Sequence, residues 1–78
     1  MNLKQAKEYF EDGMITHFEA VPDPLTDGGW MLVLCGKNDR SWDFHTALGE
    51  VRIFSKVDTL VGQVESIAGP VSSMRISV

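Results

Sequence analysis

The chain has 78 residues, of which 44% are hydrophobic and 23% charged, and its eleven acidic and seven basic side chains give a formal net charge of −4. This composition argues against disorder, which requires low hydrophobicity and high net charge. It also argues against non-specific binding to nucleic acid or anionic lipid, because that requires clustered Lys and Arg. A chain this short folds as one domain with little room for a deep catalytic cavity, so we expect residues 1–78 to form a single domain.

The use of cysteine and the absence of long apolar runs predict where the protein resides. Cys35 is the only cysteine and cannot form an internal disulfide, whereas small secreted domains usually need several. No stretch approaches 18 apolar residues, so we expect no membrane partner. The N-terminal segment is amphipathic and carries acids, which is typical of neither a signal nor a transit peptide. A reducing, cytoplasmic location is the expectation.

The first predicted elements are a helix and a strand. Asn2 with Gln5 three residues later has the pattern of an N-cap with a capping box, and Gly13 is a natural helix end. We therefore predict a helix over about 3–12. The residues from Met14 to Val21 suit a strand, which the segment Pro22-Asp23-Pro24 ends because each proline removes a backbone donor.

Three further strands are predicted in the middle of the chain. Residues 30–35 form a continuous apolar run bounded by glycines, which is typical of a buried central strand. Residues 41–48 alternate, with Trp42 and Phe44 on one side of the strand. Residues 51–54 are a short fourth strand. Turn residues separate these segments, so we expect an antiparallel arrangement.

The last part of the chain predicts a helix followed by a strand. Ser55 with Asp58 reads as a capping box, and the apolar stripe from Val57 to Ala68 indicates a helix that ends at Gly69-Pro70. The tail from Val71 alternates again. The predicted class is therefore α+β, with order α-β-β-β-β-α-β. We expect a mainly antiparallel sheet of four to five strands packed against two helices, with a right-handed crossover to the last strand.

The predicted sheet has more apolar surface than two short helices can cover. The strand over 30–35 is apolar on both sides, whereas a sheet with one wet face normally alternates. We expect some of Met31, Val33, Trp42 and Phe44 to lie in a surface patch, and large patches mark interfaces. A symmetric homodimer is the commonest way to cover such a patch. In the alternative, the loop 22–29 folds over this face, or the helices divide between the two faces.

The sequence carries no recognisable catalytic, metal or cofactor motif. Cys35 ends a buried apolar run, where cysteine acts as a small hydrophobe, and neither His17 nor His45 is near it in sequence. Zinc-type ligand spacings, a calcium loop and a phosphate loop are all missing from the pattern. We therefore predict no catalytic residues, no metal and no cofactor, and a small enzyme is the least favoured function.

Nucleic-acid binding is the main alternative to protein binding. The order α-β-β-β…α resembles double-stranded RNA-binding domains, which grip phosphates with lysines at the start of the second helix. Here that position offers Lys56, and Lys37, Arg40 and Arg52 add a modest basic patch. Eleven acids against seven bases make nucleic acid the less favoured partner.

Three segments together resemble a known group of proteins. They are the run from Trp30 to Lys37, the segment from Thr46 to Asp58 that contains GEVRIF, and Ile67-Ala68-Gly69. The pattern of strand, glycine turn, capped helix and glycine resembles short accessory proteins of bacterial plasmids and integrative elements. These are described as ParC-type partition-associated or replication-associated proteins. The resemblance covers about residues 30–69 and implies an accessory role in plasmid or mobile-element maintenance, exerted through a protein partner.

Overall fold

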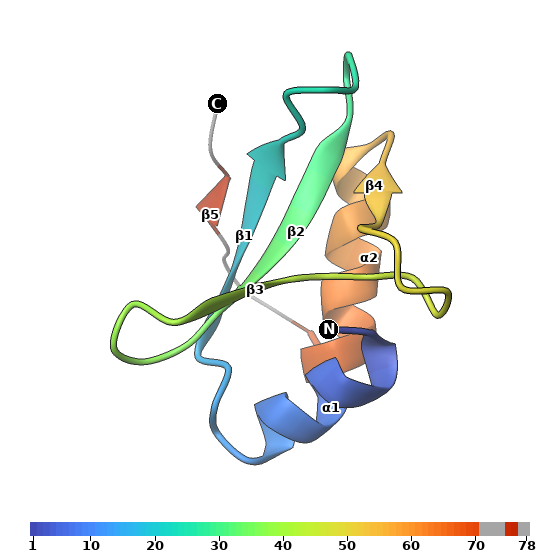
Figure 1. The fold of residues 1–78 in the computed structure, drawn as a ribbon. Coiled ribbons are helices and arrows are strands. Elements are labelled where there is room, and N and C mark those ends of the chain that lie inside the picture. Colours follow the sequence, from blue (N-terminus) through green and yellow to red (C-terminus); the bar gives the residue numbers. More distant parts are fainter. Residues whose placement is uncertain (71–74, 77–78) are drawn as a thin grey trace.

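The computed structural model describes residues 1–70 and the backbone of residues 75–76, and it shows two helices beside one twisted sheet (Figure 1). The predicted α+β class and element order are confirmed. In chain order the elements are α1 (Leu3–Glu11), β1 (His17–Pro22), β2 (Trp30–Cys35), β3 (Ser41–Asp43), β4 (Ile53–Phe54), α2 (Val57–Ala68) and β5 (Arg75–Ile76).

The sheet is built around β2, which pairs with three other strands. Antiparallel pairing of β1 with β2 runs from His17 opposite Cys35 to Pro22 opposite Trp30. On its other side β2 pairs with β3 near its end and with β4 at its start, both antiparallel. β5 lies parallel to β1, so α2 provides the predicted crossover. The expected alternation at Met74 and Val78 lies outside the described residues.

The two helices begin in different ways. At α1 the Asn2 side chain accepts a hydrogen bond from the Gln5 N–H at 2.9 Å, and the Gln5 side chain accepts one from the Asn2 N–H at 3.0 Å. The predicted capping box of α1 is therefore confirmed. The N-cap of α2 is Lys56, whose side chain makes no capping bond. The predicted box at Ser55 is wrong, because α2 begins one residue later than that box requires.

The strands β3 and β4 are shorter than the predicted segments 41–48 and 51–54. After Asp43 the chain folds back on itself: the Thr46 N–H donates to the Glu50 carbonyl at 2.7 Å, and the Gly49 N–H donates to the Thr46 carbonyl at 3.0 Å. An isolated bridge between His45 and Val51 is the remaining strand-like pairing there. These local bonds replace the longer strand that the alternating pattern suggested.

One hydrophobic core lies between the helices and one side of the sheet. Side chains alternate across a strand, so residues 18, 20, 32, 34 and 54 share the side that faces the helices. The buried core is formed by Ala6, Ile15, Phe18, Ala20, Leu32, Leu34, Phe44, Phe54, Leu60, Val64 and Ile67. The helices therefore cover one face of the sheet, and the strands present their other face outward.

Candidate functional site

The outward face of the sheet carries an apolar strip across three neighbouring strands. Val21 on β1 lies opposite Met31 on β2, and Met31 lies opposite Ile53 on β4. Val33 follows two residues after Met31 and so projects on the same side. All four side chains are half-buried. We call the strip formed by Val21, Met31, Val33 and Ile53, with the residues that flank it, the open face.

Polar residues flank the strip in an ordered way. Val33 lies opposite Glu19 on one neighbouring strand and opposite Asp43 on the other. The following row places His17, Cys35 and Ser41 side by side. Arg75 is the register partner of Glu19 on the far side of β1. From the start to the end of β2, the open face is therefore first apolar, then flanked by the carboxylates of Glu19 and Asp43, and finally polar.

The loop between β1 and β2 extends the hairpin and does not fold back over the open face. The Asp23 N–H donates to the Gly29 carbonyl at 2.9 Å, which continues the ladder beyond Pro22. Leu25 at the tip of the loop is 93% exposed. The alternative in which this loop covers the spare face is therefore wrong, and so is the one in which the helices divide between faces.

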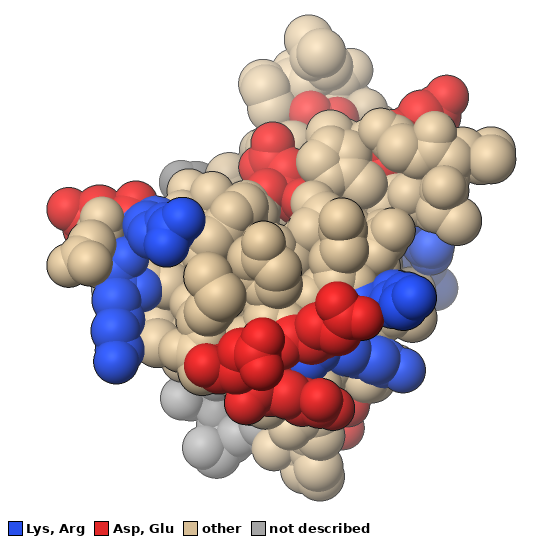
Figure 2. Space-filling model, turned by 60° about the horizontal axis from the view of Figure 1, so that its bottom comes forward, with Lys and Arg blue, Asp and Glu red and all other residues tan. Residues whose placement is uncertain are grey.

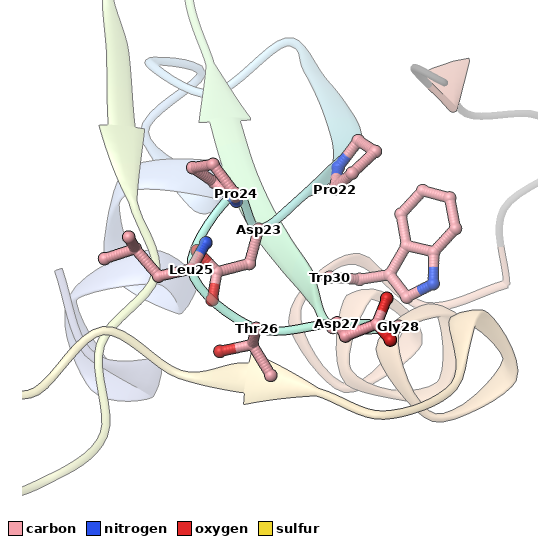
Figure 3. Close-up of a pocket in the computed structure, with 9 residues that line it drawn as sticks. Pro22, Asp23, Pro24, Leu25, Thr26, Asp27, Gly28 and Trp30 are labelled. Carbon is pink, nitrogen blue, oxygen red and sulfur yellow. The ribbon is translucent and has the colours of Figure 1, made fainter.

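A shallow hollow lies within that loop, and its form argues against a ligand site. It is lined by residues 22–30 and encloses about 490 Å³. Figure 3 shows that the labelled side chains point in different directions and not into a common space. The Asp23 carboxylate accepts a hydrogen bond from the Leu25 N–H at 3.3 Å, so it serves the turn itself. The Asp23 carboxylate therefore has a structural role in the turn.

The four residues predicted for the interface divide between the two faces of the sheet. Met31 and Val33 lie on the open face, as expected. Phe44 is 3% exposed and belongs to the core, so its predicted place in a surface patch is wrong. Trp42 lies opposite Leu34 on the helix side, half-buried, with its ring edge-on to Tyr9 at 5.6 Å. The register that pairs Trp42 with Leu34 turns both aromatic rings to the helix side, because residues two apart on a strand project to the same side.

The basic residues predicted for nucleic-acid contact do not meet in one patch. Lys37 and Arg40 lie in the turn between β2 and β3, and the Arg40 guanidinium packs over Trp42 at 5.5 Å. Arg52 precedes β4, and Lys56 precedes α2. Figure 2 shows basic side chains in separate groups at the two sides of the molecule, with acidic side chains between them. This arrangement does not offer a continuous track for a phosphate backbone.

The structure brings one histidine beside the cysteine, although they are far apart in sequence. His17 lies directly opposite Cys35, because the β1–β2 hairpin places the two strand ends together. Pairing the two predicted strands as a hairpin, in the register that the structure shows, could have revealed from the sequence that His17 and Cys35 are neighbours. Neither residue lines the hollow in the loop 22–30, the hollow beside the start of α1 or the hollow beside the β2–β3 turn. Within residues 1–70, no three His, Cys, Asp or Glu side chains gather closely enough to hold a metal ion.

The second histidine contacts the start of the chain. The Met1 amino nitrogen lies 2.8 Å from His45 Nδ1 and donates to the Asp43 carbonyl at 2.6 Å. Burial lowers the pKa of this amino group, and the negative charge of Asp43 partly opposes that effect. These bonds connect the start of α1 to the end of β3 and the loop that follows it. The contact of His45 with Met1 is therefore structural.

Comparison with protein-family models, with curated proteins and with solved structures finds no match in any of the three. The resemblance to partition-associated proteins of mobile elements therefore stays a prediction. Within the part of the chain that the structure describes, no helix has the length and apolar character needed to cross a bilayer.

Proposed function

We propose that this chain is a non-enzymatic accessory protein that binds another protein through its open face. The observation that carries the proposal is the strip of four half-buried apolar side chains, Val21, Met31, Val33 and Ile53, side by side on three strands. An apolar surface of this kind, bordered by polar residues, is typical of a protein-binding site.

The charges around the strip favour a basic partner. Asp43 is exposed beside Val33, and the whole chain carries a formal net charge of −4. A second copy laid on the same face would bring a second Asp43 and a second net negative charge, which disfavours association. A partner segment with apolar residues flanked by Lys or Arg would instead gain from both features. We therefore assign the open face to such a segment in preference to a homodimer.

The proposed biological setting is based on the sequence resemblance. Short accessory proteins of plasmids and integrative elements act through a protein partner, and the open face would provide the contact. The separation of Lys37 and Arg40 from Arg52 weighs against direct nucleic-acid binding. We propose a role in mobile-element maintenance in which this chain contacts a protein and not DNA or RNA.

A peptide titration followed by NMR tests the proposal. The probe is a synthetic helical peptide with leucines along one side and lysines flanking them, added to isotope-labelled protein. We expect amide shifts centred on Met31 and Val33, and affinity reduced about tenfold by Val33→Thr, since binding buries this side chain. Val61→Thr, which makes the same change at a half-buried position on α2, is the control.

A second pair of variants tests the charge preference. Asp43→Asn should weaken binding of the lysine peptide severalfold, whereas Asp39→Asn in the β2–β3 turn should not. Asp39 has a φ of 60°, which asparagine tolerates, so this control keeps the turn. Shifts centred on α2, or equal losses in both members of a pair, would show that the open face is not the binding surface.

A further inference from the structure

A separate hollow on the helix side of the sheet concentrates positive charge. It lies between the start of α1, the loop that joins β3 to β4, and α2, and it encloses about 590 Å³. Lys4 and Lys7 of α1 line it, together with Arg52 from the loop and Gln63 from α2. Its size is in the range of small-molecule sites.

The charge of this hollow is opposite to that of the whole protein. Three of the seven basic side chains in the sequence line this hollow, although the formal net charge of the chain is −4. None of the residues that line the hollow is acidic. The acids of the same segments, Glu8 and Glu11 on α1 and Glu50 in the loop, are not among the lining residues. A local excess of positive charge from two separate segments, α1 and the β3–β4 loop, is the feature expected of an anion site.

Contacts position Arg52 and leave its charge available, and Lys4 and Lys7 are exposed beside it at the same hollow. The Arg52 guanidinium packs over the Phe54 ring at 4.8 Å, and the Arg52 N–H donates to the Phe44 carbonyl at 3.0 Å. Lys4 and Lys7 are three residues apart on α1 and so project from neighbouring positions on one side of the helix. Among the residues that the structure describes, none of these three cations forms an ion pair with a carboxylate.

We infer that this hollow binds a small organic phosphate. A planar guanidinium with two nearby ammonium groups matches the several oxygens and the multiple charge of a phosphate or diphosphate group. The apolar side chains of Leu3 and Ala47 also line the hollow, and they provide a surface for an uncharged part of the ligand. The site lies on the helix side of the sheet and does not depend on the function proposed for the open face.

Calorimetry at low salt, with adenosine diphosphate, pyrophosphate and adenosine as probes, tests this inference. We expect adenosine diphosphate to bind, pyrophosphate to bind more weakly, and uncharged adenosine not to bind. Arg52→Gln and Lys7→Gln should each weaken the binding of adenosine diphosphate about tenfold. The controls Arg40→Gln and Lys56→Gln make the same change of charge outside the hollow and should leave the affinity unchanged within about twofold.

Two further measurements keep the test decisive. Arg52→Lys, with circular dichroism to confirm folding, should retain more affinity than Arg52→Gln, since it keeps the charge and loses the planar fork. Equal weakening by Arg40→Gln and Arg52→Gln would overturn the inference, because the effect would then be general electrostatics. A single-stranded oligonucleotide that binds more tightly than adenosine diphosphate, and that Arg40→Gln also weakens, would overturn it in favour of nucleic-acid binding.

Discussion

The two faces of β2 differ sharply although their residues alternate along one strand. Leu32 and Leu34 point toward the helices and are 1% and 0% exposed, whereas Met31 and Val33 point the other way and remain half-buried. All four are apolar, so hydrophobicity alone does not separate the two faces. The difference arises because α1 and α2 lie on the same side of the sheet. In a chain this small, the placement of two helices decides which apolar residues become core and which become surface.

The largest expected effect compares one residue from each face. Phe44→Ala should lower the free energy of unfolding by about 3–5 kcal/mol, because it empties a buried site. Val33→Ala on the open face should cost about 1 kcal/mol or less, since its side chain is already partly in water. Urea denaturation of both variants measures this difference. Equal losses would mean that the open face is packed in solution.

Two glycine substitutions test how tightly the helix side of the sheet is packed. A Cβ at Gly36 would collide with the Met14 carbonyl and crowd the Trp42 ring, so Gly36→Ala should cost about 1–3 kcal/mol. A Cβ at Gly62 on the exposed side of α2 meets nothing within 4 Å, and Gly62→Ala should stabilise the protein by about 0.5–1 kcal/mol. Denaturation curves that moved in the same direction for both variants would contradict this packing.

The start of α1 helps to cover the side of the sheet that faces the helices. Asn2→Ala removes the acceptor for the Gln5 N–H and should lower stability by about 1 kcal/mol. Asn2→Asp keeps an acceptor at the same place and should retain stability. Thermal unfolding of the two variants provides the measurement, and the prediction fails if alanine and aspartate behave alike.

The smallest expected effect concerns the start of α2. Lys56 has the extended backbone of an N-cap, with φ −139° and ψ 140°, but offers no side-chain acceptor. Lys56→Ser should therefore stabilise the protein by about 0.5–1 kcal/mol, because the hydroxyl can accept from the Thr59 N–H. Lys56→Gln removes the same charge without capping. A gain in melting temperature no greater for serine than for glutamine would contradict the capping explanation.

Much of the fold could be predicted from local patterns. The Asn2–Gln5 box, the stripe from Val57 to Ala68 and the apolar run over 30–35 each depend on near neighbours, and each marks an element that forms. The length of β3 could not be predicted, because it depends on backbone bonds between Thr46 and Glu50 that the alternating pattern does not reveal. The box at Ser55 failed by a single residue, an error that capping patterns alone do not resolve.

The candidate site was only partly predictable for the same reason. Two short helices implied that one sheet face stays open, and Met31 and Val33 are the two candidates that lie on that face. Assigning Trp42 and Phe44 to a face required the register of β3 against β2, which depends on contacts between distant residues. The hollow lined by Lys4, Lys7 and Arg52 went unnoticed because its cations come from segments more than forty residues apart.

The measurement that tests the central claim most directly is the solution mass by light scattering over a wide concentration range. The account predicts a monomer of 8.7 kDa at every concentration, with the open face left for a different, basic partner. A stable dimer of twice that mass, which Val33→Lys returns to the monomer, would contradict it, because a second copy would then occupy the face.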